Sequence, residues 1–138
     1  RARPARRKTM DIKFFDDPLE QPRGREDTRF RQIGLFIYPE RRVFAFGVEL
    51  TPFVERPSIE VHVRNGAGEP AGSLHVIETL TPNFSLTMHL RDATTLNPYE
   101  LTAVLYYAWP DQDRIEVDRQ TVHFSMDEGG EHRFPFNA

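Results

Sequence analysis

From residue 30 onward, apolar and polar residues alternate in short runs that are separated by turn-forming residues. Alternation with a period of two is typical of strands that bury one face, and no segment shows the longer period of an amphipathic helix. Between the third and fourth runs, the sequence Asn65-Gly66-Ala67-Gly68 supplies the positive-φ residues of a hairpin turn. The runs predict seven strands, at residues 30–38, 42–50, 58–64, 73–79, 84–90, 99–108 and 114–126.

The last predicted strand changes phase along its length. Its apolar residues, Ile115 among them, occupy odd positions up to Val117 and even positions from Val122 onward. A strand can turn both sets toward the core only if one residue is inserted between them. We therefore expect a bulge or turn near Asp118-Arg119 that keeps both apolar sets inward.

Seven short strands at this spacing, with little helix, are typical of an all-β protein with two packed antiparallel sheets. We expect the sandwich over residues 30–126, preceded by a basic, mostly irregular N-terminal extension over residues 1–29. Residues 127–138 are expected to form a C-terminal tail. The chain length suits one such domain with extensions, because 138 residues can bury one sizeable core.

Residues 97–106, with the sequence NPYELTAVLY, resemble the penultimate strand of fibronectin type III and related immunoglobulin-like domains. The resemblance implies an immunoglobulin-like sandwich in which Tyr99 is a tyrosine corner, its ring packed inward and its hydroxyl bonded to upstream backbone. The early strands lack the tryptophan usual in these folds, and Phe44 or Phe46 is expected in its place. The motif marks a superfamily with no single activity, so it does not specify a function.

Composition excludes several kinds of chemistry. The chain has no cysteine, which removes disulfide scaffolds, cysteine-ligated metals and thiol nucleophiles. It has no Gly-x-Ser-x-Gly motif, and its paired carboxylates, such as Asp111 and Asp113, lie in turns. We expect neither enzymatic activity nor a cofactor. No apolar run is long enough for a membrane-spanning helix, and the start lacks the apolar stretch of a signal peptide, which favours a cytoplasmic location.

Charge is distributed unevenly along the chain, although 18 basic and 21 acidic side chains give a net charge of only −3. Residues 1–31 hold ten basic and six acidic side chains, and the remainder holds eight and fifteen. The arginine-rich start, which includes Arg6 and Arg7, could bind phosphates or anionic headgroups, or acidic patches of its own domain or a neighbour, or serve only as a linker. The acidic domain behind it makes nucleic acid an unfavourable partner.

Five histidines raise the question of a metal site, and four of them lie on predicted strands between apolar neighbours. Alternation turns these four away from the core. His62 and His75 occupy the two arms of one hairpin and could approach each other, but the sequence indicates no third ligand. We therefore expect exposed sheet histidines and no metal site. The five are His62, His75, His89, His123 and His132.

Some strands are apolar on both faces, notably residues 30–38 and 42–50. A two-layer sandwich should present a mostly polar outer face to water, so one sheet is expected to need a cover. The sequence leaves three candidates open: the segment around Phe14-Phe15, the tail Phe134-Pro135-Phe136, or another chain.

These features together predict a non-catalytic protein-protein interaction or assembly module that uses an apolar sheet face and an arginine-rich N-terminal arm. Its partner would be a protein, either a second copy in a homodimer or a different chain. The alternative is a carbohydrate- or ligand-binding module that stacks its ligand on the same aromatic residues, and a weaker one is nucleic-acid binding through the basic tail. The candidate partner-binding residues are Phe36, Tyr106, Tyr107, Trp109, Arg6 and Arg7.

Overall fold

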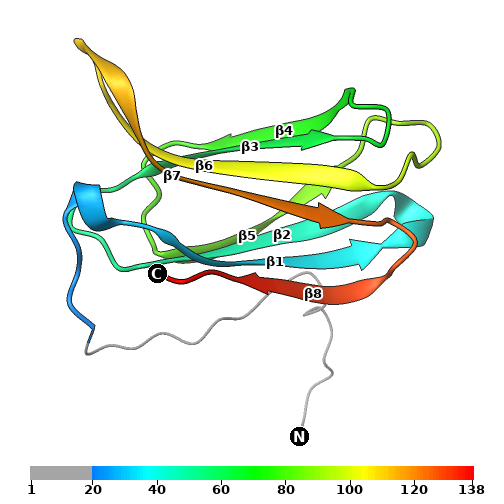
Figure 1. Ribbon diagram of the computed structural model, residues 1–138, viewed down its shortest axis with the longest axis horizontal. Helices are drawn as coiled ribbons and strands as arrows, with labels where there is room; N and C mark the ends of the chain where they lie inside the picture. Colours follow the sequence, from blue (N-terminus) through cyan, green and yellow to red (C-terminus); the bar gives the residue numbers. More distant parts are fainter. Residues whose placement is uncertain (1–19) are drawn as a thin grey trace, which may run out of the picture.

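A computed structural model describes residues 20–138 as a sandwich of two four-stranded antiparallel sheets (Figure 1). The strand order is β5-β2-β1-β8 in the first sheet and β4-β3-β6-β7 in the second. The strands are β1 (Phe30–Tyr38), β2 (Val43–Leu50), β3 (Ser58–Arg64), β4 (Pro70–Val76), β5 (Asn83–His89), β6 (Tyr99–Trp109), β7 (Gln112–Phe124) and β8 (Gly130–Pro135). The two short 3-10 turns are η2 (Arg25–Asp27) and η3 (Pro39–Arg41). The predicted all-β antiparallel sandwich is confirmed.

All seven predicted strands are present, and β1 and β3 have the predicted bounds. The others shift by one to three residues, most of all β4, which begins at Pro70 instead of residue 73. Arg64 pairs with Pro70 across a short turn, so pairing starts before the apolar pattern of β4 does. Within the described residues 20–138, no helix is long and apolar enough to cross a bilayer.

The eighth strand, β8, lies in the segment 127–138 that we expected to be a tail. It pairs with β1, with Ile33 opposite Phe134, and thereby completes the first sheet. Phe134 and Phe136 pack against the core. The pattern missed this strand because only two apolar residues stand among charged ones, and because a single short run after a glycine pair resembles a loop.

The core lies between the sheets and contains the alternate residues that the pattern assigned to it. Phe44 and Phe46 are both fully buried. The Phe124 ring lies 5.0 Å from Phe44 and 5.6 Å from Tyr99, measured between ring centroids. These three rings join the two sheets near the end of the sandwich at which β2 and β6 begin and β7 ends.

Tyr99 begins β6 with its ring fully buried. Its hydroxyl accepts a hydrogen bond from the Leu96 backbone N–H and donates one to Asp92 Oδ2, both at 2.9 Å. The predicted bond to upstream backbone is therefore confirmed. The carbonyl of Leu96 in turn accepts a 2.6 Å hydrogen bond from the N–H of Gly66, where a Cβ would lie 2.5 Å from the Asn97 carbonyl oxygen. Glycine at this position lets the loop before β6 pack against the β3–β4 turn.

The irregularity predicted near Asp118-Arg119 is also present, and it lies in β7. Leu105 of β6 pairs with Asp118, but Tyr106 pairs with Glu116, which leaves Val117 of β7 without a partner. Val117 packs against the core, whereas Ile115 is 48% exposed. The expectation that both apolar sets face inward is wrong for Ile115, because the β6–β7 hairpin extends beyond the end of the sandwich there (Figure 1).

Candidate binding site at the loop end of the sandwich

Three connections meet at one end of the sandwich, which we call the loop end (Figure 1). They are the β2–β3 loop (51–57), the β4–β5 loop (77–82) and the β6–β7 turn, and η2 lies beside them. Antiparallel sandwiches bring loops that are distant in sequence together in this way. Such loops are held by a rigid scaffold but are free of core packing, and binding residues are concentrated on them.

The loop end exposes large apolar side chains. The described residues include six such exposed side chains, of which four belong to the loop end: Val54 at 71% exposure, Ile77 at 67%, Leu80 at 73% and Ile115 at 48%. A single exposed aliphatic residue needs no explanation, but several at one end of a domain indicate a contact surface.

Tyr107 and Trp109, at the end of β6, form an aromatic pair at the same end of the sandwich. Their rings are nearly parallel, 12° apart in orientation with centroids separated by 6.2 Å. The guanidinium carbon of Arg25 in η2 lies 4.9 Å from the Trp109 ring centroid, a cation–π distance. Trp109 stays partly exposed, so it is both fixed in orientation and accessible.

The hydroxyl of Tyr107 ties three segments together. It donates to the Glu55 carbonyl oxygen at 3.0 Å and shares a 3.2 Å hydrogen bond with Thr28 Oγ1. Arg25 also donates to the Glu55 carboxylate at 3.0 Å. Burial raises the pKa of Tyr107, because its hydroxyl is removed from water. The loop end is therefore a preorganised structure, in which the β2–β3 loop and the η2 segment are fastened to β6.

A pocket of about 230 Å³ opens at this end. It combines aromatic walls with carboxylates and one guanidinium, and is lined by Glu55, Arg56, Ser58, Glu78, Tyr107, Ala108 and Trp109. Pockets for drug-sized ligands usually measure about 300–1,000 Å³. This pocket lies below that range.

The structure does not gather the four predicted aromatic residues into one surface. Tyr107 and Trp109 lie together at the loop end. Phe36 points outward from β1 in the first sheet, with Tyr38 as its neighbour at 5.1 Å between ring centroids. Tyr106 points outward from the second sheet and is only 7% exposed, because Arg114 lies 4.3 Å above its ring. The predicted cations Arg6 and Arg7 lie outside the described residues.

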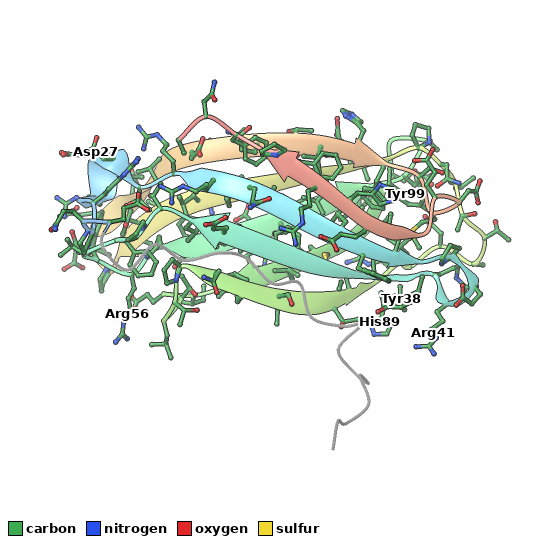
Figure 2. The ribbon with its side chains drawn as sticks, turned by 90° about the horizontal axis from the view of Figure 1, so that it is seen from below. Asp27, Tyr38, Arg41, Arg56, His89 and Tyr99 are labelled. Atoms are coloured by element: carbon green, nitrogen blue, oxygen red, sulfur yellow. The ribbon has the colours of Figure 1, made fainter. Side chains whose placement is uncertain are left out.

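Six outward residues of β1 and β2 form a surface that we call the apolar face: Gly34, Phe36, Tyr38, Val43, Ala45 and Gly47. The polar pair Gln32 and Glu49, hydrogen-bonded at 2.9 Å, lies next to them on the same side of the sheet. All eight residues of β2 are buried, although only half of them point to the opposite sheet. The tail residues Phe134 and Phe136 do not cover this face, because they pack against the core. The other intramolecular candidate, Phe14-Phe15, lies outside the described residues. Figure 2 shows Tyr38 and His89 near Arg41, at the end of the molecule away from Asp27 and Arg56.

The second sheet carries what we call the charged face, formed by outward residues of β3, β4, β6 and β7. Glu60 lies at its centre and accepts a 2.6 Å hydrogen bond from Arg114. This bond lowers the pKa of Glu60 to about 2, and a hydrogen bond from His62 acts in the same direction. The members of the face are Glu60, His62, His75, Thr102, Val104, Tyr106, Arg114, Glu116 and Arg119.

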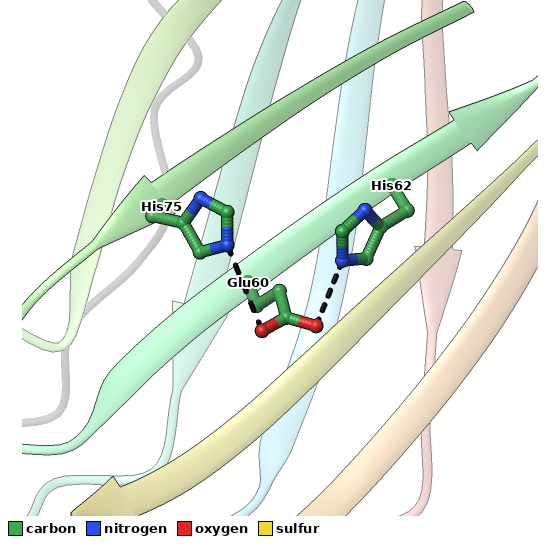
Figure 3. A group of neighbouring side chains, drawn as sticks. All are labelled: Glu60, His62 and His75. Carbon is green, nitrogen blue, oxygen red and sulfur yellow. Dashed lines mark hydrogen bonds and ion pairs between the residues drawn. The ribbon is translucent and has the colours of Figure 1, made fainter. Parts of the chain in front are cut away.

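The predicted approach of His62 and His75 is confirmed, with ring centroids 5.9 Å apart. Both rings point toward Glu60, which sequence reasoning did not consider as a partner (Figure 3). The sequence pattern could have indicated this contact, because residues 60 and 62 share a strand face and Glu60 stands directly opposite His75 in the hairpin. Elsewhere on this sheet, His123 forms a simpler pair with Glu100 at 3.4 Å.

No protein-family model matches this chain, and no curated protein matches it.

Proposed function

We propose that this chain is a non-catalytic assembly module, which binds a second copy of itself through the loop end. The observation that carries the proposal is the concentration of exposed aliphatic residues at the same end of the sandwich as a fixed, partly exposed Trp109. Buried aromatic anchors surrounded by apolar and charged residues are typical of protein interfaces. The apolar face contributes less to this proposal than the sequence suggested, because Val43 and Ala45 are already 8% and 0% exposed in the single chain.

The strand arrangement supports an immunoglobulin-like, fibronectin type III-like relationship. In such domains strands A, B and E share one sheet, and C, F and G share the other. Here β1, β2 and β5 share a sheet, as do β3, β6 and β7, and Tyr99 begins the strand in the position of F. By the same correspondence, the loop end holds the B–C and F–G connections, which serve as binding loops in variable domains. The added strand β8 departs from that pattern.

The charges of the loop end support self-association. Arg25 and Arg56 lie close to Glu55 and Glu78, so the rim carries both signs within a small area. A two-fold interface brings the same patch of each subunit together, and a patch with both signs can then pair with itself. A rim of one sign would repel its copy instead.

The contacts of Trp109 favour a protein partner over the second candidate, a carbohydrate- or ligand-binding module. The Trp109 ring, which would be the stacking platform for a sugar, is already in contact with Arg25 and Tyr107. A glycan array would test the second candidate directly, and silence there together with firm self-association separates the two functions.

Light scattering across a range of protein concentrations tests the proposal. We expect the wild-type chain to form a dimer, and Trp109→Ala to weaken dimerisation about thirtyfold, the effect of losing an interface anchor of about 2 kcal/mol. Leu80→Asp places a charge on the same surface and should give a monomer. Both variants should keep the thermal unfolding temperature of the wild type within a few degrees, because neither side chain belongs to the core.

Leu96→Asp is the matched control. Leu96 is 42% exposed and lies in the loop before β6, at the other end of the sandwich. This variant should dimerise like the wild type. A wild-type chain that stays monomeric at the highest concentration it tolerates would overturn the proposal, and so would equal losses in the Leu80 and Leu96 variants.

A further inference from the structure

The β3–β4 hairpin places two imidazoles and a carboxylate on one spot of the charged face. Glu60 and His62 are two residues apart on β3 and therefore point to the same side of the sheet. His75 of β4 stands directly opposite Glu60 in the antiparallel register. The three side chains come from adjacent strands, so the sheet backbone fixes the positions of their Cβ atoms.

Their polar atoms converge. His62 Nε2 lies 2.7 Å from Glu60 Oε2, and His75 Nε2 lies 3.6 Å from Glu60 Oε1 (Figure 3). The three possible ligand atoms all lie within 4.8 Å of one another. Zn²⁺ binds imidazole nitrogen and carboxylate oxygen at about 2.0–2.2 Å, which places neighbouring tetrahedral ligand atoms about 3.4 Å apart. Small side-chain rotations therefore suffice to seat an ion between the three groups.

The exposure of the groups allows those rotations. The His62 and His75 side chains are 48% and 49% exposed, so they can turn without disturbing the core, and an ion can reach them from solvent. Glu60 is more enclosed, at 17%, and is held by Arg114. An ion would compete with this guanidinium for the carboxylate, because Arg114 donates to Oε1 at 2.6 Å.

We propose that Glu60, His62 and His75 form a binding site for a divalent transition-metal ion of the zinc class. Among residues 20–138 this is the one group in which three such ligands come together. Two imidazoles select late first-row ions over Mg²⁺ and Ca²⁺, which prefer oxygen ligands. Three protein ligands leave a fourth tetrahedral position for water or another donor. The site is separate from the loop end and does not depend on the proposed assembly.

Calorimetric titration of the chelator-stripped full chain with Zn²⁺ tests the site. We expect one saturable site, and binding roughly tenfold weaker or more in His62→Ala and in His75→Ala, because each variant removes one ligand. Mg²⁺ and Ca²⁺ should give no saturable binding. Both variants lose only a half-exposed side chain, so their thermal unfolding in chelator should match that of the wild type, and Trp109→Ala should bind Zn²⁺ like the wild type.

His123→Ala is the matched control. His123 also faces a carboxylate, Glu100, across the same sheet, but with a single imidazole. This variant should bind Zn²⁺ as tightly as the wild type. The absence of saturable binding, or a loss in His123→Ala equal to that in His75→Ala, would overturn the site.

Arg114→Gln tests the part assigned to Glu60. Removing the guanidinium frees the carboxylate, so we expect this variant to bind Zn²⁺ several-fold more tightly than the wild type. Unchanged or weaker binding would overturn Glu60 as a ligand, because a carboxylate that binds the ion must respond to the loss of its competitor.

Discussion

The two sheets of the sandwich have outer faces of opposite character. On the apolar face, Gly34 stands opposite Gly47, and Phe36 stands opposite Ala45. On the charged face, outward positions in the middle of the sheet hold Glu60 and Arg119 on either side of Val104. Both faces nevertheless bury their central residues, with Ala45 at 0% exposure and Val104 at 1%.

The outer face of a sheet can therefore exclude water in two ways. The charged face covers itself, because the guanidinium of Arg114 lies over the Tyr106 ring. Val104 stands between the long side chains of Glu60 and Arg119 on the neighbouring strands. The small side chains of the apolar face cannot do this, since alanine and glycine cover little beyond their own backbone. Ala45, which stands opposite Phe36, nevertheless has no exposed surface, so a charge placed at this position has no route to water.

The largest expected effect is a charge in the middle of the apolar face. Ala45→Glu should lower the free energy of unfolding by about 3 kcal/mol or more, because the carboxylate would be buried without a partner. Thr102→Glu, at a central but half-exposed position of the charged face, should cost at most about 0.5 kcal/mol. Urea denaturation measures both. Equal tolerance of the two variants would mean that the apolar face is open to solvent.

An intermediate effect is expected from uncovering the charged face. Arg114→Ala should cost about 1–2 kcal/mol, because it exposes the Tyr106 ring and removes the cation that pairs with Glu60. Arg119→Ala is the matched control on the same strand: its side chain is 55% exposed and pairs at the surface with Glu116, so a clearly smaller loss than in Arg114→Ala is expected. Equal losses in the two variants would contradict the covering role of Arg114.

The contrast between the faces also explains which parts of the fold could be predicted from the sequence. Alternation alone specified the inward residues, because burial against the opposite sheet requires one side chain in two. The pattern of SIEVHVR shows this, with Ile59, Val61 and Val63 all in the core. It also indicated that one sheet is apolar on both sides. It missed β8, whose short run contributes few apolar residues and pairs with a strand about a hundred positions earlier.

The candidate sites were harder to predict because they depend on register. Tyr107 and Trp109 could be proposed as anchors from their residue types, but their contacts with Thr28 and Arg25 join positions that only the fold brings together. The contact between Arg114 and Glu60 depends on the unpaired Val117, which sets the pairing of the β6–β7 hairpin beyond it. If the register there were assigned one residue differently, Arg114 would be placed on the opposite face of the sheet.

The smallest expected effect concerns a surface ion pair on the charged face. Arg119 donates to both carboxylate oxygens of Glu116, at 2.8 and 2.9 Å, and this lowers the pKa of Glu116 below its ordinary value of 4.5. A carboxyl group whose pKa is lowered by folding stabilises the fold at pH values above its ordinary pKa. This contribution is lost as the pH falls through the lowered pKa. Glu116→Gln should therefore cost at most about 0.5 kcal/mol near neutral pH and nothing in strong acid.

Urea denaturation of Glu116→Gln near neutral pH and in strong acid, repeated in the Arg119→Ala background, measures this contribution. In that background the substitution should have no effect at either pH, because the partner is already absent. A difference from wild type that is the same at both pH values would show that the carboxylate charge is not its source. A loss as large as that of Arg114→Ala would mean that ion pairs hold the charged face in place. We expect instead that the burial of Tyr106 and Val104 does so, and that the charges above them mainly keep water from the sheet.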